Sequence, residues 1–238
     1  MVTAKHIILD PYIRKPKPTL FERYNRLFER SGNLTHVNQV RTRLISNLAK
    51  RLMTDERLVD RLPVRRVENP IGQEDPLDCM FCAYVNALEL VTPRRIESEF
   101  DALQRKRALI DEAKKMNNGL VMYDLGFSQK MLDKYLPGYT IVKAQTPIEV
   151  LKALFVHRAV GFVGHFGKSR FFGHALTMYA ERNPDTNAAR IVRFGNIFPG
   201  LESIDFLVTD INSELESFRK FFHENNSYFF FMPKGTKI

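Results

Sequence analysis

The sequence is poor in cysteine and has no long hydrophobic run. Its two cysteines, Cys79 and Cys82, lie three residues apart, which excludes a disulfide framework and favours reduced thiols in a compartment such as the cytoplasm. No apolar run reaches the length that spans a bilayer. A secretory signal is not expected, because Asp10 and Pro11 close the short apolar run near the start. Export by a signal-free route would leave no trace in the sequence.

Acidic residues are also scarce in the first quarter of the chain. Residues 1 to 66 hold 15 Lys and Arg residues against 6 Asp and Glu residues, whereas residues 67 to 238 hold 21 of each. The whole net charge of +9 therefore belongs to the N-terminal part. This asymmetry predicts two parts, a basic helical extension over residues 1–66 and a neutral domain over residues 67–238.

The periodicity of apolar residues predicts helices first and strands afterwards. No internal repeat or low-complexity tract interrupts this order. The predicted helices cover residues 20–30, 36–53, a short segment ending at 62, 79–91, 93–116, 128–136, 147–157 and 212–224. The predicted strands cover residues 139–143, 159–166, 174–180, 189–194, 204–208 and 228–232. This order indicates an α+β fold with a mostly antiparallel sheet.

The segment from residue 73 to residue 91 carries the strongest candidate for chemistry. Asp78 is a favourable N-cap residue, so Cys79 should occupy the first helical position. There the helix dipole and unpaired backbone N–H groups favour the thiolate, which is the nucleophilic form. Gln73 precedes Cys79 by six positions, so its amide could donate to an oxyanion formed on an attacked carbonyl. The bland alternative is that a cysteine on an apolar helix is only a small hydrophobic residue, and this suits Cys82.

Thiol chemistry also needs a base and a group that orients it. Among six histidines, His174 has the best context, because Gly173 precedes it and it begins an apolar strand. Asn196 follows the next predicted strand. If these two strands pair antiparallel, Asn196 returns beside His174, where its amide could fix the imidazole tautomer. Each residue alone has a structural explanation, such as a turn for Asn196, and the ordered set is what favours catalysis.

This ordered set resembles the papain-like cysteine peptidase superfamily. The pattern is Gln-x5-Cys at a helix start, Gly-His opening a strand, and a polar residue after the next strand. It is most similar to the bacteriocin-processing (double-glycine-leader) peptidase branch, in which the cysteine also follows an Asp. The sequence departs from these families at Met80, at the missing tryptophan after the cysteine, and at Asn196, where that branch more often has Asp-Pro.

The resemblance implies a papain-like α+β fold, in which the cysteine helix packs on the sheet that carries the histidine. It implies that Cys79 is the nucleophile, His174 the base, Asn196 the orienting residue and Gln73 the oxyanion donor, with no cofactor or metal. The expected activity is cleavage of a peptide or isopeptide amide in a protein or peptide substrate. A glutamine deamidase or transglutaminase of the same fold would use the same acyl-enzyme, and the sequence does not separate these activities.

Other hypotheses use the same residues differently. Cys79 and Cys82 form a Cys-x2-Cys pair, but the strand that precedes such redox pairs is missing. A zinc site would need His165 and His174, which are nine residues apart rather than at a familiar finger spacing. A third hypothesis is an inactive papain-like binding module. In every case the basic residues 1–66 could bind an acidic protein, nucleic acid or an anionic membrane surface.

Overall fold

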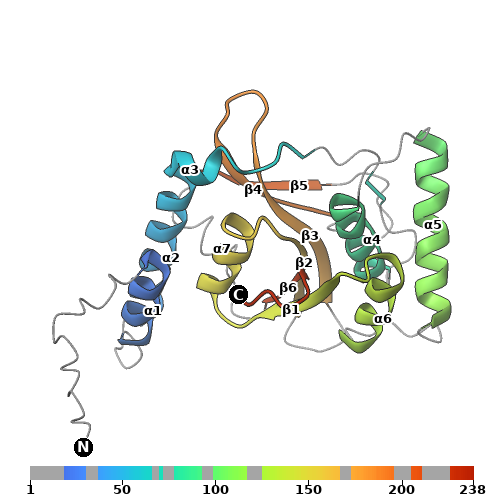
Figure 1. The fold of residues 1–238 in the computed structure, drawn as a ribbon, viewed down its shortest axis with the longest axis horizontal. Helices are drawn as coiled ribbons and strands as arrows, with labels where there is room; N and C mark the ends of the chain where they lie inside the picture. The colour runs from blue at the N-terminus through green and yellow to red at the C-terminus, as the bar shows by residue number, and fades with distance from the viewer. Residues whose placement is uncertain are drawn as a thin grey trace, which may run out of the picture.

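A six-stranded antiparallel sheet forms the centre of the protein in the computed structural model (Figure 1). The structure describes residues 19–30, 37–65, 70–71, 78–92, 99–116, 125–166, 173–195, 205–210 and 226–238. The strands are β1 (Tyr139–Ala144), β2 (Val160–Phe166), β3 (Gly173–Arg182), β4 (Ala189–Gly195), β5 (Asp205–Asp210) and β6 (Asn226–Pro233). Their order in the sheet is β1-β6-β2-β3-β4-β5, and each neighbouring pair is antiparallel.

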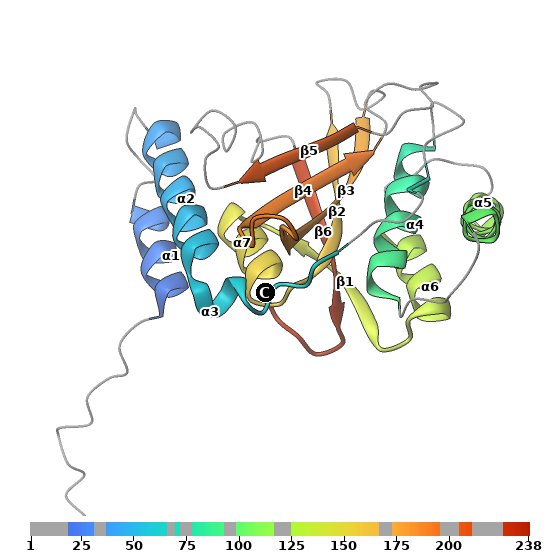
Figure 2. The same ribbon diagram turned by 90° about the horizontal axis from the view of Figure 1, so that it is seen from above.

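Helices cover both faces of this sheet. They are α1 (Leu20–Arg30), α2 (Val37–Thr54), α3 (Glu56–Val59), α4 (Cys79–Val91), α5 (Glu99–Met116), α6 (Leu125–Tyr135) and α7 (Pro147–Phe155). Seen from above, α7 lies between the sheet and the α1–α2 pair, while α4 and α6 cover the opposite face and α5 lies outside α4 (Figure 2). The predicted α+β class with a mostly antiparallel sheet is confirmed.

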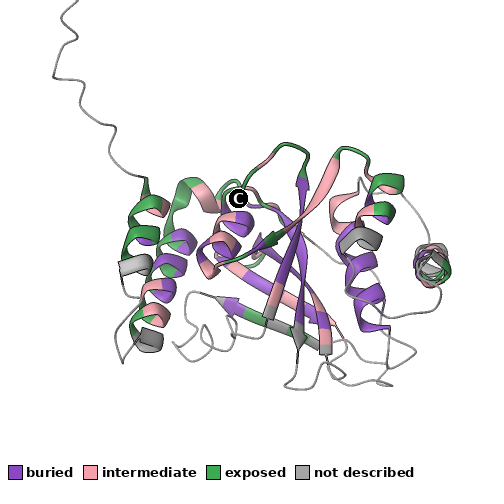
Figure 3. Cartoon of the chain, turned by 90° about the horizontal axis from the view of Figure 1, so that it is seen from below, coloured by how far each residue is buried: buried purple, intermediate pink, exposed green. Residues whose placement is uncertain are grey.

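The alternation of side chains along each strand sorts the core into two clusters. In β6, Phe229 and Phe231 pack with α4, whereas Phe230 and Met232 pack with α2 and α7. Because both faces of the central strands are covered, β6 is apolar at consecutive positions rather than at every second one. The buried residues accordingly lie along the strands and along the sides of the helices that face them (Figure 3).

The N-terminal helices share this core. Leu48 and Leu52 of α2 are fully buried in the same cluster as Met178 of β3 and Val150 of α7. The predicted boundary between residues 66 and 67 therefore marks a change in charge, and the hydrophobic packing continues across it.

Local sequence signals place several helix ends where they were expected. Thr19 and Glu22 form the predicted capping box of α1, with each side chain accepting from the other residue's backbone N–H. Thr146 and Glu149 form the same motif at the start of α7. Helix α6 begins at Leu125 instead of the predicted residue 128. The predicted helix over residues 212–224 lies outside the described residues.

Candidate active site

Cys79 is the first helical residue of α4, as predicted. The N–H of Cys82 donates to the carbonyl of Asp78 at 2.9 Å, which fixes the first turn of the helix. Every residue from 79 to 88 is buried, because α4 lies between the sheet and α5. Cys79 and Cys82 are each 6% exposed, and neither is part of a disulfide.

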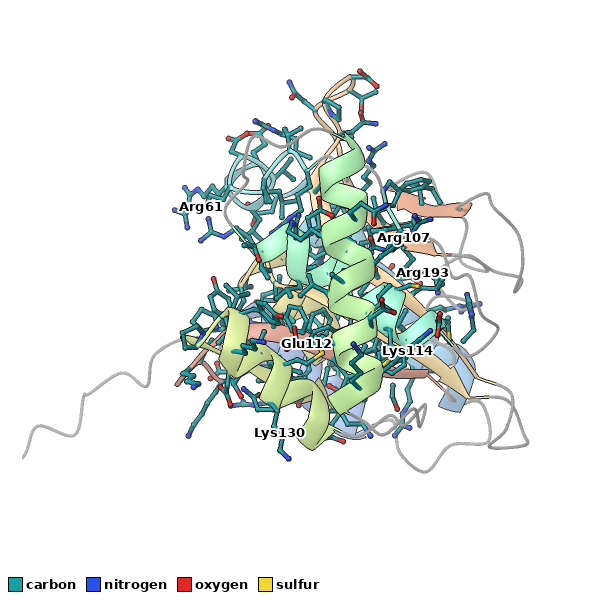
Figure 4. All side chains as sticks on the ribbon, turned by 90° about the vertical axis from the view of Figure 1, so that its right-hand side faces the viewer. Arg61, Arg107, Glu112, Lys114, Lys130 and Arg193 are labelled. Carbon is teal, nitrogen blue, oxygen red and sulfur yellow. The ribbon has the colours of Figure 1, made fainter. Side chains whose placement is uncertain are left out.

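The carboxylate of Asp78 does not cap this helix. Asp78 occupies the N-cap position, but its side chain makes no capping hydrogen bond. Lys114 of α5 instead places its ammonium 2.7 Å from Oδ1 and 2.7 Å from Oδ2 of Asp78. The predicted N-cap position is therefore confirmed, and an ion pair between two helices takes the place of a side-chain capping bond. Figure 4 shows Lys114 near the C-terminal end of α5.

Helix α4 and strand β3 run in the same direction. In the middle of both, the hydroxyl of Thr177 donates to the carbonyl of Ala83 at 2.9 Å. At their C-terminal ends, Arg65 donates from Nη1 to the carbonyl of Leu90 at 2.7 Å, and from its backbone N–H to Glu181 Oε2 at 3.2 Å. Ala83 precedes Leu90 along α4, and Thr177 precedes Glu181 along β3. The two sets of hydrogen bonds therefore occur in the same order along both elements, which means that α4 and β3 are parallel.

This alignment brings Cys79 and His174 to the same end of the sheet. Cys79 precedes Ala83 by four residues, or about 6 Å of helix. His174 precedes Thr177 by three residues, or about 10 Å of strand. The two residues therefore differ by only about 4 Å in level along the common direction.

The register of β3 assigns the His174 ring to the other face of the sheet. Ala175 and Tyr179 pack in the α4 cluster, whereas Leu176 and Met178 pack in the α7 cluster. The ladder between β2 and β3 is regular from Gly161–Met178 to Phe166–Gly173, so the alternation continues to the strand end. His174 then shares the face of Leu176. Its ring must reach past the end of the sheet to approach the Cys79 thiol.

Gln73 and Asn196 lie outside the described residues, but their neighbours are placed. Ile71 is held against α4 by two hydrogen bonds with the Asn86 side chain, both 3.0 Å long. Gly195 ends β4 beside Leu176, since a Cβ on Gly195 would lie 2.7 Å from Leu176 Cδ2. The residue before Asn196 is therefore next to the residues that follow His174.

Two polar features near this end have no sequence signal of their own. Arg193 of β4 pairs in register with Met178 and therefore shares the His174 face. Burial lowers the pKa of Arg193, and nearby Tyr228 partly opposes this shift. Lys114 is the second feature, since only tertiary packing brings it to Asp78, 36 residues away.

The zinc hypothesis gains no support from the described residues. Within the described ranges, no group of three His, Cys, Asp or Glu side chains could hold a metal ion.

None of the described helices is long and apolar enough to cross a membrane. The chain matches no family model, no curated protein and no solved structure.

Proposed function

We propose that the protein is a cysteine-dependent amide hydrolase with a papain-like arrangement, in which Cys79 is the nucleophile. The observation that carries this proposal is the parallel alignment of α4 and β3, which brings the first residue of α4 and the first residues of β3 to one end of the sheet. A thiol at a helix N-terminus and an imidazole at the adjoining strand end are the two groups that acyl transfer requires.

The start of α4 favours the thiolate of Cys79 for two reasons. The dipole of α4 stabilises negative charge at its N-terminus. The neighbouring Asp78 carboxylate would oppose that charge, but Lys114 neutralises it through the ion pair. The electrostatic field at the Cys79 sulfur then comes mainly from the N-terminus of α4.

In the proposed reaction the Cys79 thiolate attacks the carbonyl carbon of a peptide or isopeptide bond. The His174 imidazolium donates a proton to the leaving amine, and water then hydrolyses the thioester and regenerates the thiol. Asn196 would orient the imidazole, while Gln73 and the Cys79 backbone N–H would donate to the oxyanion. A deamidase or transglutaminase would form the same thioester on a glutamine side chain and differ in the group that resolves it.

A second candidate function is a non-catalytic module with the same shell. The alternation of side chains along β3 favours this non-catalytic module, because the alternation assigns His174 to the sheet face that α4 does not cover. The equal burial of Cys79 and Cys82 also fits two inert core thiols. In this case the working surface of the protein would lie elsewhere.

Thiol labelling at a series of pH values tests the proposal, with Cys82 as the matched control. Cys82 lies one turn further along α4 and is buried to the same extent as Cys79. The protein would be treated with iodoacetamide between about pH 5 and pH 8, where activated thiols titrate. We expect rapid modification that disappears in Cys79→Ala and persists in Cys82→Ala.

The role of His174 is tested in the same assay. His174→Ala should shift the pH profile of Cys79 labelling and abolish hydrolysis of a peptide library, while His157→Ala should change neither. His157 is a suitable control because it is also half-buried and follows α7, away from α4. Slow, equal labelling of both cysteines would overturn the hydrolase proposal in favour of the inert module. Reactive Cys79 with an unchanged profile in His174→Ala would refute His174 as the base.

A further inference from the structure

Helix α2 presents a positively charged face that is not used in packing. The helix contains Arg41, Arg43, Lys50 and Arg51 and has no acidic residue over its 18 positions. One side of it is buried in the core through Ile45, Leu48, Ala49, Leu52 and Met53. The opposite side exposes Val40, Arg43, Asn47, Lys50, Arg51 and Thr54.

These exposed residues form one continuous stripe along the helix. At 100° per residue, positions 40, 43, 47, 50, 51 and 54 fall within roughly one third of the circumference. Its three cations therefore point to the same side of the molecule. Since α2 lies on the outer flank next to α1, no other described element covers this stripe (Figures 1 and 2).

The neighbouring helix α1 carries two further exposed arginines, Arg23 and Arg26. Of the two acidic residues of α1, Glu22 accepts the Thr19 N–H in the capping box, and this hydrogen bond lowers the Glu22 pKa. We call Arg23, Arg26, Arg43, Lys50 and Arg51 together the α1–α2 basic surface.

Two large apolar side chains are exposed on the same pair of helices. Leu27 of α1 is 47% exposed and Val40 of α2 is 38% exposed. Leu27 lies three residues before the end of α1 and Val40 three residues after the start of α2, so both are near the connection between the helices. Exposed aliphatic groups beside arginines are typical of helices that lie on a lipid surface.

We propose that the α1–α2 basic surface binds the anionic headgroups of a membrane, with Leu27 and Val40 inserted among them. Each Lys or Arg side chain near an anionic leaflet adds its own electrostatic attraction, and the aliphatic side chains add hydrophobic contact with the lipid. Single-stranded nucleic acid would be expected to use stacked aromatic side chains as well. In the described part of α1 and α2, no aromatic side chain is exposed. This inference does not depend on the chemistry of Cys79.

Vesicle flotation with the full chain tests the proposal. We expect binding to phosphatidylcholine vesicles that contain phosphatidylserine, weaker binding at higher salt, and no binding to phosphatidylcholine alone. The variant Arg43→Ala/Lys50→Ala/Arg51→Ala should lose on the order of tenfold to a hundredfold in affinity for the anionic vesicles. Because the three side chains are exposed, its thermal unfolding should match that of the wild type.

A charge-matched control separates this surface from net charge. Arg107, Lys115 and Lys130 are exposed. They belong to α5 and α6, which lie on the flank opposite α1 and α2 (Figure 2). Replacing these three with Ala removes the same charge and should leave vesicle binding unchanged. An equal loss in both triple variants would overturn the proposal, as would equal binding to neutral vesicles.

The apolar pair distinguishes lipid from nucleic acid. Leu27→Ser/Val40→Ser should weaken vesicle binding with no change in charge. Binding of an RNA or DNA oligonucleotide that depends on Arg43, Lys50 and Arg51, together with no binding to vesicles, would refute the membrane proposal and assign this surface to nucleic acid.

Discussion

Helices α4 and α2 lie on opposite faces of the sheet and differ in how much of their surface is enclosed. Helix α4 is buried at every residue from 79 to 88, because the sheet covers one side and α5 the other. Helix α2 is buried only along the side that faces α7 and the sheet, and its outer side is exposed and cationic. Both helices contribute to the core, but only α2 has a lateral surface available to a partner.

This difference determines where each helix can act. An enclosed helix can present chemistry only at its ends, where the helix dipole acts most strongly. For α4 that end is Cys79, with Asp78 and Lys114 beside it. A half-buried helix can bind along its length, and α2 carries its charges there. If α4 is as enclosed as this difference requires, substitutions inside it should lower the stability more than matched substitutions at exposed positions.

The largest expected effect concerns an ion pair that α5 buries against α4. Glu89 of α4 pairs with Lys106 of α5, whose side chain is fully buried. Glu89→Gln removes the carboxylate that faces this ammonium, so the free energy of unfolding should fall by about 3 kcal/mol in urea titration. The control is Glu112→Gln, since Glu112 pairs with Lys134, which is 56% exposed. This control should remain close to the wild type. Equal effects would mean that the interface between α4 and α5 is open.

Two valines, one in α4 and one in α2, allow the same comparison for the burial of apolar side chains. Val85 in α4 is 1% exposed, whereas Val40 in α2 is 38% exposed. Val85→Ala should lower the free energy of unfolding by about 2 kcal/mol, through lost burial and the cavity left behind. Val40→Ala should have almost no effect, because Ala has the higher helix propensity and little contact is lost. A small effect at Val85 would contradict the enclosure of α4.

The smallest expected effect is electrostatic and concerns the end of α4. Lys114→Met leaves the Asp78 carboxylate unneutralised beside Cys79, so the pH midpoint of Cys79 labelling should rise by about one unit. Asp78→Asn should not raise it, and the double variant should return it close to the wild-type value. If Lys114→Met raised the midpoint equally in the Asp78→Asn background, the ion pair would not be the cause.

Much of the fold could be predicted because local sequence determines it. The capping boxes at Thr19 and Thr146 involve residues three apart, and the apolar period of residues 37–54 is visible without any partner. Cys79 at the start of α4 was predicted for the same reason. The apolar run of residues 79–91, which only Asn86 and Glu89 interrupt, likewise indicated a helix enclosed on nearly all sides.

The contacts around the candidate site that the sequence did not predict involve residues distant in sequence. Asp78 occupies the predicted N-cap position of α4, yet Lys114 binds its carboxylate from another helix. The amide of Asn86, a polar residue within the apolar run of α4, holds the backbone of Ile71. Local sequence patterns do not predict hydrogen bonds between residues that are 15 or 36 positions apart, because such contacts form only when the elements pack.

The sequence by itself determined the elements, the α+β order, the concentration of positive charge before residue 67 and the cysteine at a helix start. These properties depend on neighbours within a few positions, where propensity, capping and periodicity act. Only the tertiary structure decided that α4 and β3 run in parallel, that Lys114 neutralises Asp78, and that His174 shares a sheet face with Leu176. The physical reason is that strand register and helix packing follow from burial on both sheet faces, which involves the whole chain at once.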